Sequence, residues 1–130
     1  MTGWTADDVI EAARAVRVYL SQLVPDPMAV DARLAALLGL ETPGWEAEME
    51  ILDVLRSTED LRAWTAAFMT GRAPPQISAT RTAGVDIRVS SPVSFERFVC
   101  PSGDFSWYRF LPGERAPPCP THSLPLQRAP

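Results

Sequence analysis

The sequence predicts an α+β fold, in which an N-terminal four-helix bundle is followed by a small antiparallel β hairpin or ribbon. Two shifts along the chain support this division. Residues 1–70 contain 12 acidic side chains, five basic side chains and three prolines. Residues 71–130 contain four acidic side chains, seven basic side chains and ten prolines. The hydrophobic period also changes there, from that of a helix to that of a strand. We therefore expect a helical bundle over residues 1–72 and a β-rich, proline-rich module over residues 73–130.

Four helices are predicted because residues that favour helix starts and stops recur along the first half. The start signals are Thr5 with Asp8, Asp26 with Pro27, Thr42 with Pro43, and Thr58. The stop signals are Pro25, Gly39 and Gly71. Apolar residues at helical spacing predict a core of Leu20, Leu34, Leu37, Leu52, Leu55, Trp64 and Phe68. The third helix is expected to bury Trp45 and Met49 together with Leu52 and Leu55.

Strands are predicted where apolar and polar residues alternate. The three candidates are residues 85–89, 95–100 and 105–111, which we expect to form a short meander. A turn over Pro101 to Asp104 separates the last two candidates. Residues 112–130 are too rich in proline for a central strand, so this stretch is expected on the surface or wrapped around the bundle.

The chemistry-bearing residues cluster near the C-terminus. Both cysteines and the single histidine of the chain occur as Cys100-Pro101 and Cys119-Pro120-Thr121-His122. This spacing suits a structural zinc ion, for which Cys100, Cys119 and His122 would supply three of the four ligands. Asp104 is a weaker candidate for the fourth ligand, and a water molecule is another. Because the set is incomplete, the balance between structural zinc and no cofactor lies slightly against zinc.

Three other interpretations of the cysteines stay open. They could be a packed pair of thiols without a ligand, or a disulfide, which a reducing cytoplasm disfavours. A Cys/His nucleophilic pair is the third, but no residue that would orient the histidine is evident in the sequence. We predict that Cys100, Cys119 and His122 converge whichever of these interpretations holds. Only an irregular tail would keep them apart.

The segment Val99 to Arg109, followed by Pro118-Cys119-Pro120-Thr121-His122, resembles a zinc-ribbon or rubredoxin-knuckle tail. Such tails occur in small proteins of actinobacterial multi-component conflict systems, where a further cysteine usually precedes the aromatic strand. This chain lacks that cysteine. The helical stretches Ala12 to Leu20 and Leu34 to Leu38 are similar to adaptor domains of the same systems. The resemblance implies an adaptor that binds another protein of its own system.

Two further patterns in the sequence could be functional sites. Trp107, Tyr108 and Arg109 with Arg97, Arg115 and Arg128 could form an aromatic, basic surface for single-stranded nucleic acid, but a net charge of +3 over residues 71–130 is a weak phosphate-binding field. The carboxylates of Glu46, Glu48, Glu50 and Asp53 are interpreted as a solvated helix face. The acidic helical half, with a net charge of −7, suits a basic protein partner.

We therefore predict a non-catalytic protein-protein interaction adaptor, or a regulatory subunit of a bacterial defence or regulatory complex. The alternative is a nucleic-acid-associated regulator with a zinc-ribbon-like tail, and a Cys/His-dependent enzyme is a distant third. No small-molecule substrate is indicated. Apolar runs such as Leu34 to Leu40 are far too short to cross a bilayer, and the acidic start of the chain does not resemble a secretory signal, so a cytoplasmic location without membrane contact is expected.

Overall fold

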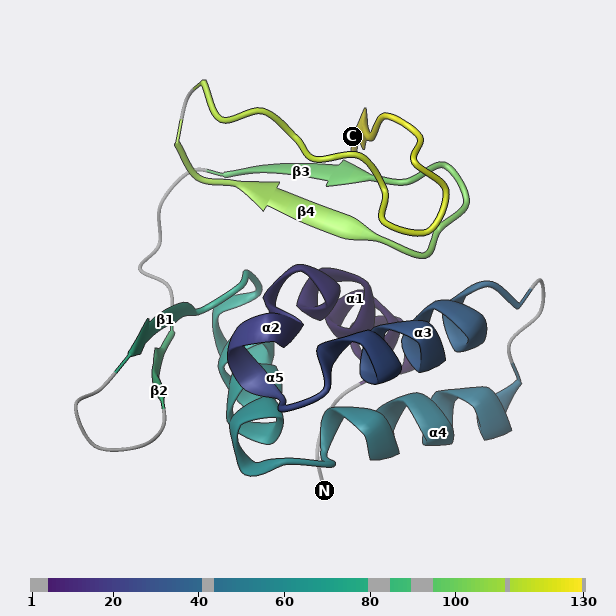
Figure 1. Ribbon diagram of the computed structural model, residues 1–130, viewed down its shortest axis with the longest axis vertical. Helices are drawn as coiled ribbons and strands as arrows, with labels where there is room; N and C mark the ends of the chain where they lie inside the picture. The colour runs from purple at the N-terminus through teal and green to yellow at the C-terminus, as the bar shows by residue number, and fades with distance from the viewer. Residues whose placement is uncertain (1–4, 41–43, 80–84, 90–94, 112, 130) are drawn as a thin grey trace.

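Helices form one layer of the molecule, and two small antiparallel sheets lie against it (Figure 1). The computed structural model describes residues 5–40, 44–79, 85–89, 95–111 and 113–129. Its helical segments are α1 (Ala6–Val16), the 3-10 turn η1 (Arg17–Tyr19), α2 (Leu20–Leu23), α3 (Pro27–Leu38), α4 (Trp45–Leu55) and α5 (Glu59–Gly71). Its strands are β1 (Gln76–Ala79), β2 (Val85–Arg88), β3 (Glu96–Val99), β4 (Ser106–Arg109) and β5 (Gln127–Arg128). The α+β class is confirmed, while the bundle arrangement of the helices stays a prediction.

Three of the predicted helix starts are made by side chains that cap free backbone N–H groups. The Thr5 hydroxyl accepts from the Asp8 N–H at 3.1 Å, and the Asp8 carboxylate accepts from the Thr5 N–H at 3.1 Å. Asp26 caps α3, which has Pro27 in its first turn, and Thr58 caps α5. Each cap satisfies a donor that the helix itself leaves unpaired.

The start of α4 differs from the other three. Its N-cap is Gly44, which has no side chain to accept a hydrogen bond. The predicted signal, Thr42 with Pro43, lies outside the described residues. The first helix also departs from a single regular helix, because η1 tightens its path between α1 and α2 before the chain reaches Pro25.

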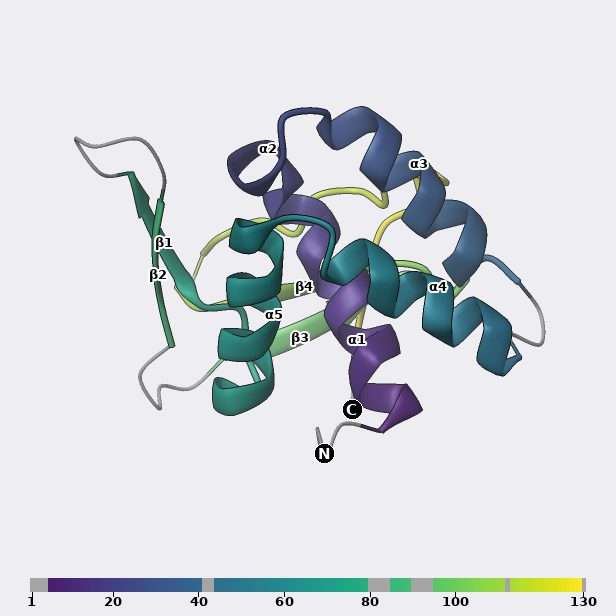
Figure 2. The ribbon, with the colours of Figure 1, turned by 90° about the horizontal axis from the view of Figure 1, so that it is seen from below.

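The core forms around α1, which lies between α5 on one side and α3 and α4 on the other (Figure 2). Five predicted core residues are buried: Leu20, Leu34, Leu55, Trp64 and Phe68. Leu37 and Leu52 are only partly buried and pack against the edge of this core. Aromatic contacts extend the core toward the sheet, since Trp64 stacks on Phe68 and the Phe68 ring meets the edge of Tyr108.

The predicted buried face of α4 was wrong for Trp45 and Met49, whereas Leu55 is buried as predicted and Leu52 is partly buried. Trp45 is 71% exposed and Met49 is 50% exposed, whereas Ala47, Ile51 and Val54 are buried. Both sets have helical spacing, so periodicity alone could not choose between them. The smaller, more branched set fits against α1 and α3, and α4 presents its largest aromatic residue to solvent.

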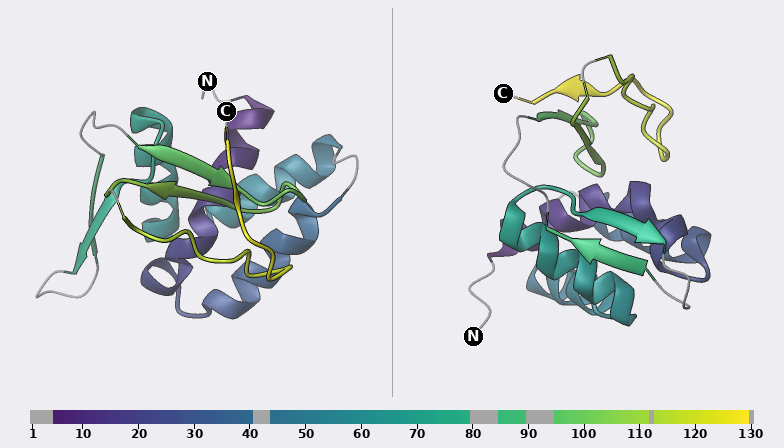
Figure 3. Two further views of the ribbon diagram at one scale, coloured as in Figure 1. Left: turned by 90° about the horizontal axis from the view of Figure 1, so that it is seen from above. Right: turned by 90° about the vertical axis from the view of Figure 1, so that its left-hand side faces the viewer.

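The predicted meander is instead two separate sheets (Figure 3). β2 pairs with β1, a strand that the sequence did not predict, and this hairpin lies beside α5. β3 is the central strand of the other sheet, between β4 and the short β5. The proline-rich tail thus returns as a two-residue edge strand, a position where missing N–H donors are tolerated.

The three-stranded sheet is held on α1 by the partly buried carboxylate of Glu11. Glu11 accepts hydrogen bonds from the Arg97 guanidinium at 2.8 and 2.7 Å, from the Tyr108 hydroxyl at 2.6 Å and from the Ser106 hydroxyl at 3.2 Å. Burial of Glu11 by itself would raise its pKa, but the hydrogen bonds from Arg97 and Tyr108 outweigh it and hold the pKa below its ordinary value. The carboxylate is therefore a fixed negative charge at the joint between helix and sheet.

Among the described helices, none combines the length and the apolar character that crossing a bilayer requires.

Candidate metal centre

Two turns, each beginning with a Cys-Pro pair, bring the predicted ligands together. In the first turn, the Gly103 N–H donates to the Cys100 carbonyl at 2.9 Å, with Gly103 at a φ of +80° that favours glycine. In the second, the Ser123 N–H donates to the Cys119 carbonyl at 2.7 Å. The first turn links β3 to β4, and the second lies in the tail before β5. Hydrogen-bonded turns thus fix both thiols in place.

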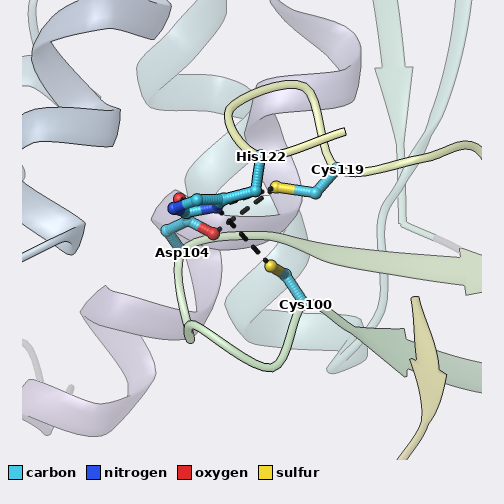
Figure 4. A group of neighbouring side chains, drawn as sticks. All are labelled: Cys100, Asp104, Cys119 and His122. Carbon is cyan, nitrogen blue, oxygen red and sulfur yellow. Dashed lines mark hydrogen bonds and ion pairs between the residues drawn. The ribbon is translucent and has the colours of Figure 1, made fainter. Parts of the chain in front are cut away.

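Cys100, Asp104, Cys119 and His122 point toward one another from these two turns (Figure 4). Their ligand atoms all lie within 4.8 Å of one another. His122 Nδ1 is 3.8 Å from Cys100 Sγ, 3.6 Å from Cys119 Sγ and 3.3 Å from Asp104 Oδ2. Cys119 Sγ is 3.6 Å from Asp104 Oδ1. The predicted convergence is confirmed, and Asp104 joins the other three.

These separations fit a tetrahedral zinc ion. With Zn–S near 2.3 Å and Zn–N or Zn–O near 2.0 to 2.1 Å, tetrahedral angles place a sulfur about 3.5 Å from a nitrogen or oxygen ligand, and a nitrogen about 3.3 Å from an oxygen. The four distances given above, 3.3 to 3.8 Å, therefore need only small adjustments, with Asp104 facing His122 through Oδ2 and Cys119 through Oδ1. The donor set of two thiolates, one imidazole and one carboxylate is also one that zinc binds.

The Asp104 carboxylate has a partner missing. Its side chain is 1% exposed, yet its Oδ2 atom is buried without a hydrogen-bond donor. The nearest guanidinium nitrogen, Arg17 Nη1, is 3.8 Å away, beyond hydrogen-bond distance. A buried carboxylate oxygen without a donor is costly unless a cation binds it. This oxygen lies 3.3 Å from His122 Nδ1, and the other oxygen of the same carboxylate lies 3.6 Å from Cys119 Sγ.

Burial around the centre is uneven. Cys100, Asp104 and Cys119 are buried, whereas the His122 side chain is 38% exposed. Burial raises the pKa of the Cys100 thiol, an effect that the neighbouring Cys119 reinforces and that a backbone hydrogen bond at Ser102 partly opposes. Both cysteines are free thiols, and the disulfide alternative does not describe this structure.

Sequence reasoning missed the two arginines that hold the centre on the helices. Arg14 Nε donates to the Gly103 carbonyl at 2.6 Å, and Arg17 Nη1 donates to the Asp104 carbonyl at 2.9 Å. Arg17 Nη2 also donates to the Thr121 hydroxyl at 2.6 Å, so this side chain contacts both turns. The signal was present, because Arg17 lies in an otherwise apolar stripe of the first helical segment, but nothing local indicated what it would bind.

Arg17 is balanced on its other side by an acidic residue of α3. Its guanidinium donates two hydrogen bonds to the Asp31 carboxylate, at 2.6 and 3.1 Å, and its side chain is only 1% exposed. It also lies 5.7 Å from the centre of the Phe105 ring, within reach of a cation–π contact. The buried arginine therefore joins η1 and α3 to both cysteine turns.

The basic residues considered for nucleic acid are largely engaged with carboxylates. Arg97 pairs with Glu11, and both Arg109 and Arg128 pair with Glu96. The Arg109 guanidinium also lies over the Phe98 ring, 5.1 Å from its centre. Three of the arginines thus have partners within the chain, which weakens the field that this surface could offer to phosphates.

Comparison of the chain with protein-family models, with curated proteins and with solved structures finds no match. The chemistry of the centre therefore has to be judged from its own geometry.

Proposed function

We propose that this chain is a zinc-binding interaction protein whose metal centre is structural. The observation that carries the proposal is the convergence of Cys100, Asp104, Cys119 and His122, whose ligand atoms all lie within 4.8 Å of one another. This set of residue types is one that a structural zinc ion binds. Structural zinc sites take all four ligands from the protein, whereas catalytic sites keep a position for water or substrate. A centre filled by four side chains is therefore a structural one.

The surroundings of the centre indicate what the metal would stabilise. Besides the two cysteines, only Phe105 is fully buried in the apolar cluster next to it, with Val18, Trp107 and Leu126 partly buried around it. So small a cluster contributes little hydrophobic free energy, and small modules of this kind are commonly stabilised by a metal. The zinc ion would join the β3–β4 turn to the tail and hold both turns against Arg17.

For the whole molecule we propose the role of adaptor or regulatory subunit, with the helical segments arranged as a four-helix bundle. The resemblance to conflict-system proteins supplies the setting, a bacterial defence or regulatory complex. The acidic helical half and the paired arginines of the sheet favour a protein partner over nucleic acid. If zinc occupies the thiolates, neither cysteine is a free nucleophile, which disfavours the Cys/His enzyme.

Metal analysis tests the structural zinc centre. The full chain would be produced in zinc-supplemented medium, purified without chelator and analysed for zinc and protein, and a parallel sample would be loaded with cobalt. We expect one zinc per chain and a cobalt spectrum with thiolate charge-transfer and tetrahedral ligand-field bands. Cys119→Ser and Asp104→Asn should weaken binding, the cysteine variant more, while Met28→Ala at an 84% exposed site should not.

Two results would overturn the proposal. One is a wild-type chain that stays metal-free in excess zinc. The other is stoichiometric zinc that Cys119→Ser and Asp104→Asn retain with unchanged affinity, because the metal would then lie elsewhere. Robust turnover of a substrate by the zinc-loaded chain would favour the enzyme instead of the adaptor.

A further inference from the structure

The surface of α4 carries an apolar stripe that no described part of the chain covers. Trp45 and Met49 are one helical turn apart and are 71% and 50% exposed, and the partly buried Leu52 continues the stripe. Leu40, at the end of α3, is 49% exposed nearby. An open groove between the two helices is lined by Leu37, Leu40, Gly44, Trp45, Glu46, Ala47 and Glu50. One large aromatic residue and several aliphatic ones thus share a single concave surface.

Carboxylates border this stripe. Glu46 and Glu50 are exposed, lie one turn apart on α4 and line the same groove. Neither makes an ion pair with any described residue, in contrast to Glu11, Glu96 and Asp31, which are paired with arginines. The acidic charges on α4 are therefore available to a binding partner, while those at the joint with the sheet are already neutralised.

We infer that this groove binds a basic amphipathic helix of a partner protein, an inference that rests on the proposed interaction function. Helices bind in grooves by placing apolar side chains at a spacing of three or four residues into the apolar surface, and Trp is the residue type most enriched at the energetic centre of interfaces. Lysine or arginine residues beside that apolar face would pair with Glu46 and Glu50.

The charges also disfavour the other occupants. A second copy of this chain would place the Glu46 and Glu50 carboxylates of both copies in one interface without a basic partner, because a two-fold interface repeats one surface on both sides. Nucleic acid and anionic membranes would be repelled in the same way. In Figure 1, α4 lies on the far side of α3 from the three-stranded sheet. Leu37 and Leu40, on the α3 side of the groove, also line a pocket with Ser102 and Gly103 of the first cysteine turn.

The chemistry of the occupant can be tested without knowing the natural partner. The zinc-loaded full chain would be used to select from a random library of peptides of about 15 residues, a length at which isolated helices become marginally stable. We expect the selected peptides to share Lys or Arg residues and apolar residues at helical spacing. Binding of a selected peptide would then be measured by calorimetry over a range of salt concentrations.

Matched variants locate the site. Trp45→Ala should weaken the selected peptide at least tenfold, and Glu46→Gln combined with Glu50→Gln should weaken it and flatten its salt dependence. Leu111→Ala, at a 65% exposed apolar residue after β4, and Glu59→Gln, at an exposed acidic residue of α5, should leave binding unchanged. All variants should keep the zinc content of the wild type.

The inference is overturned if selected peptides lack basic residues, or if they bind Trp45→Ala as tightly as the wild type. It is also overturned if sedimentation shows a wild-type dimer that Trp45→Ala dissociates, because the occupant is then a second copy. The zinc content of the same samples is measured separately. A wild-type chain that binds no zinc would overturn the proposed metal centre but not the peptide-binding result.

Discussion

The helical segments bury a continuous set of aliphatic and aromatic side chains around α1, whereas the region around the cysteines buries two thiols, one carboxylate and Phe105. Hydrophobic burial is non-directional and scales with area, so the helical region can tolerate small shifts of its elements. The cysteine turns depend on directed contacts, from Arg14 and Arg17 on one side and from the ligand cluster on the other. The two regions should therefore fail under different conditions.

Metal removal should give the largest effect and should affect mainly the second region. Structural zinc contributes about 10 kcal/mol or more of apparent free energy in zinc-finger peptides, because binding and folding are coupled. After chelation we expect amide hydrogens of β3, β4 and the tail to exchange much faster, while those in the interior of α3 and α4 stay protected. Hydrogen exchange with mass spectrometry measures this.

Restoring zinc should restore the protection of the tail, which serves as the control. If a sample shown to be metal-free keeps full protection of residues 96–128, the two regions do not differ in the way described.

Substitution of Arg17 should affect both regions, because this side chain joins them. Arg17→Met leaves the Asp31 carboxylate and the Asp104 carbonyl without their donor. Loss of one partner of a fully buried ion pair costs about 3–5 kcal/mol, and because water can reach the 32% exposed Asp31, we expect a loss no larger than this. Denaturant unfolding monitored by circular dichroism measures the loss, and zinc affinity should fall with it. Arg14→Met is the control, since Arg14 is partly exposed and donates one hydrogen bond to Gly103, so its loss should be smaller.

A cavity in the helical core should affect stability without changing the metal centre directly. Leu34 is fully buried, so Leu34→Ala should lower the free energy of unfolding by about 2–5 kcal/mol. Leu37 is one turn away and only partly buried, so Leu37→Ala should cost clearly less. Thermal unfolding of zinc-loaded samples makes the comparison, and equal losses for both leucines would contradict the assigned face of α3.

Substitution of Glu11 at the joint between the regions should give the smallest loss of stability, and this loss should depend on pH. The folded-state pKa of Glu11 lies below its ordinary value of 4.5, so its contribution to stability is present above that value and is lost as pH falls through the lowered pKa. Glu11→Gln should cost about 1–3 kcal/mol at neutral pH, the range for hydrogen bonds to a charged group.

Unfolding measured from pH 7 to pH 3 tests this prediction, since the difference between the wild type and Glu11→Gln should narrow as pH falls. Glu114→Gln, at an exposed residue of the tail, is the control and should follow the wild type. A constant difference across the range would mean that the charge of Glu11 does not stabilise the joint.

Features that depend on residues close in sequence were predictable. Thr5, Asp26 and Thr58 cap their helices because a short side chain three residues before an N–H reaches it in any protein. The Cys-Pro pairs and His122 indicated a common cluster because cysteine and histidine are typical zinc ligands and both cysteines and the single histidine lie in one stretch of the chain. These are local or compositional signals, and they led to the α+β class and to the candidate ligands.

The tertiary structure decided between alternatives that local sequence signals did not separate. Trp45 and Met49 share helical spacing with Leu52, but the other face of α4 packs on α1. The hydrophobic period of one helix does not specify which of its faces is complementary in shape to a neighbouring helix. Likewise β1 exists through its pairing with β2, a contact between separate segments. Asp104 joined the cluster of Cys100, Cys119 and His122, and received a hydrogen bond from Arg17, only when the turn after β3 packed against η1, 87 residues away in sequence.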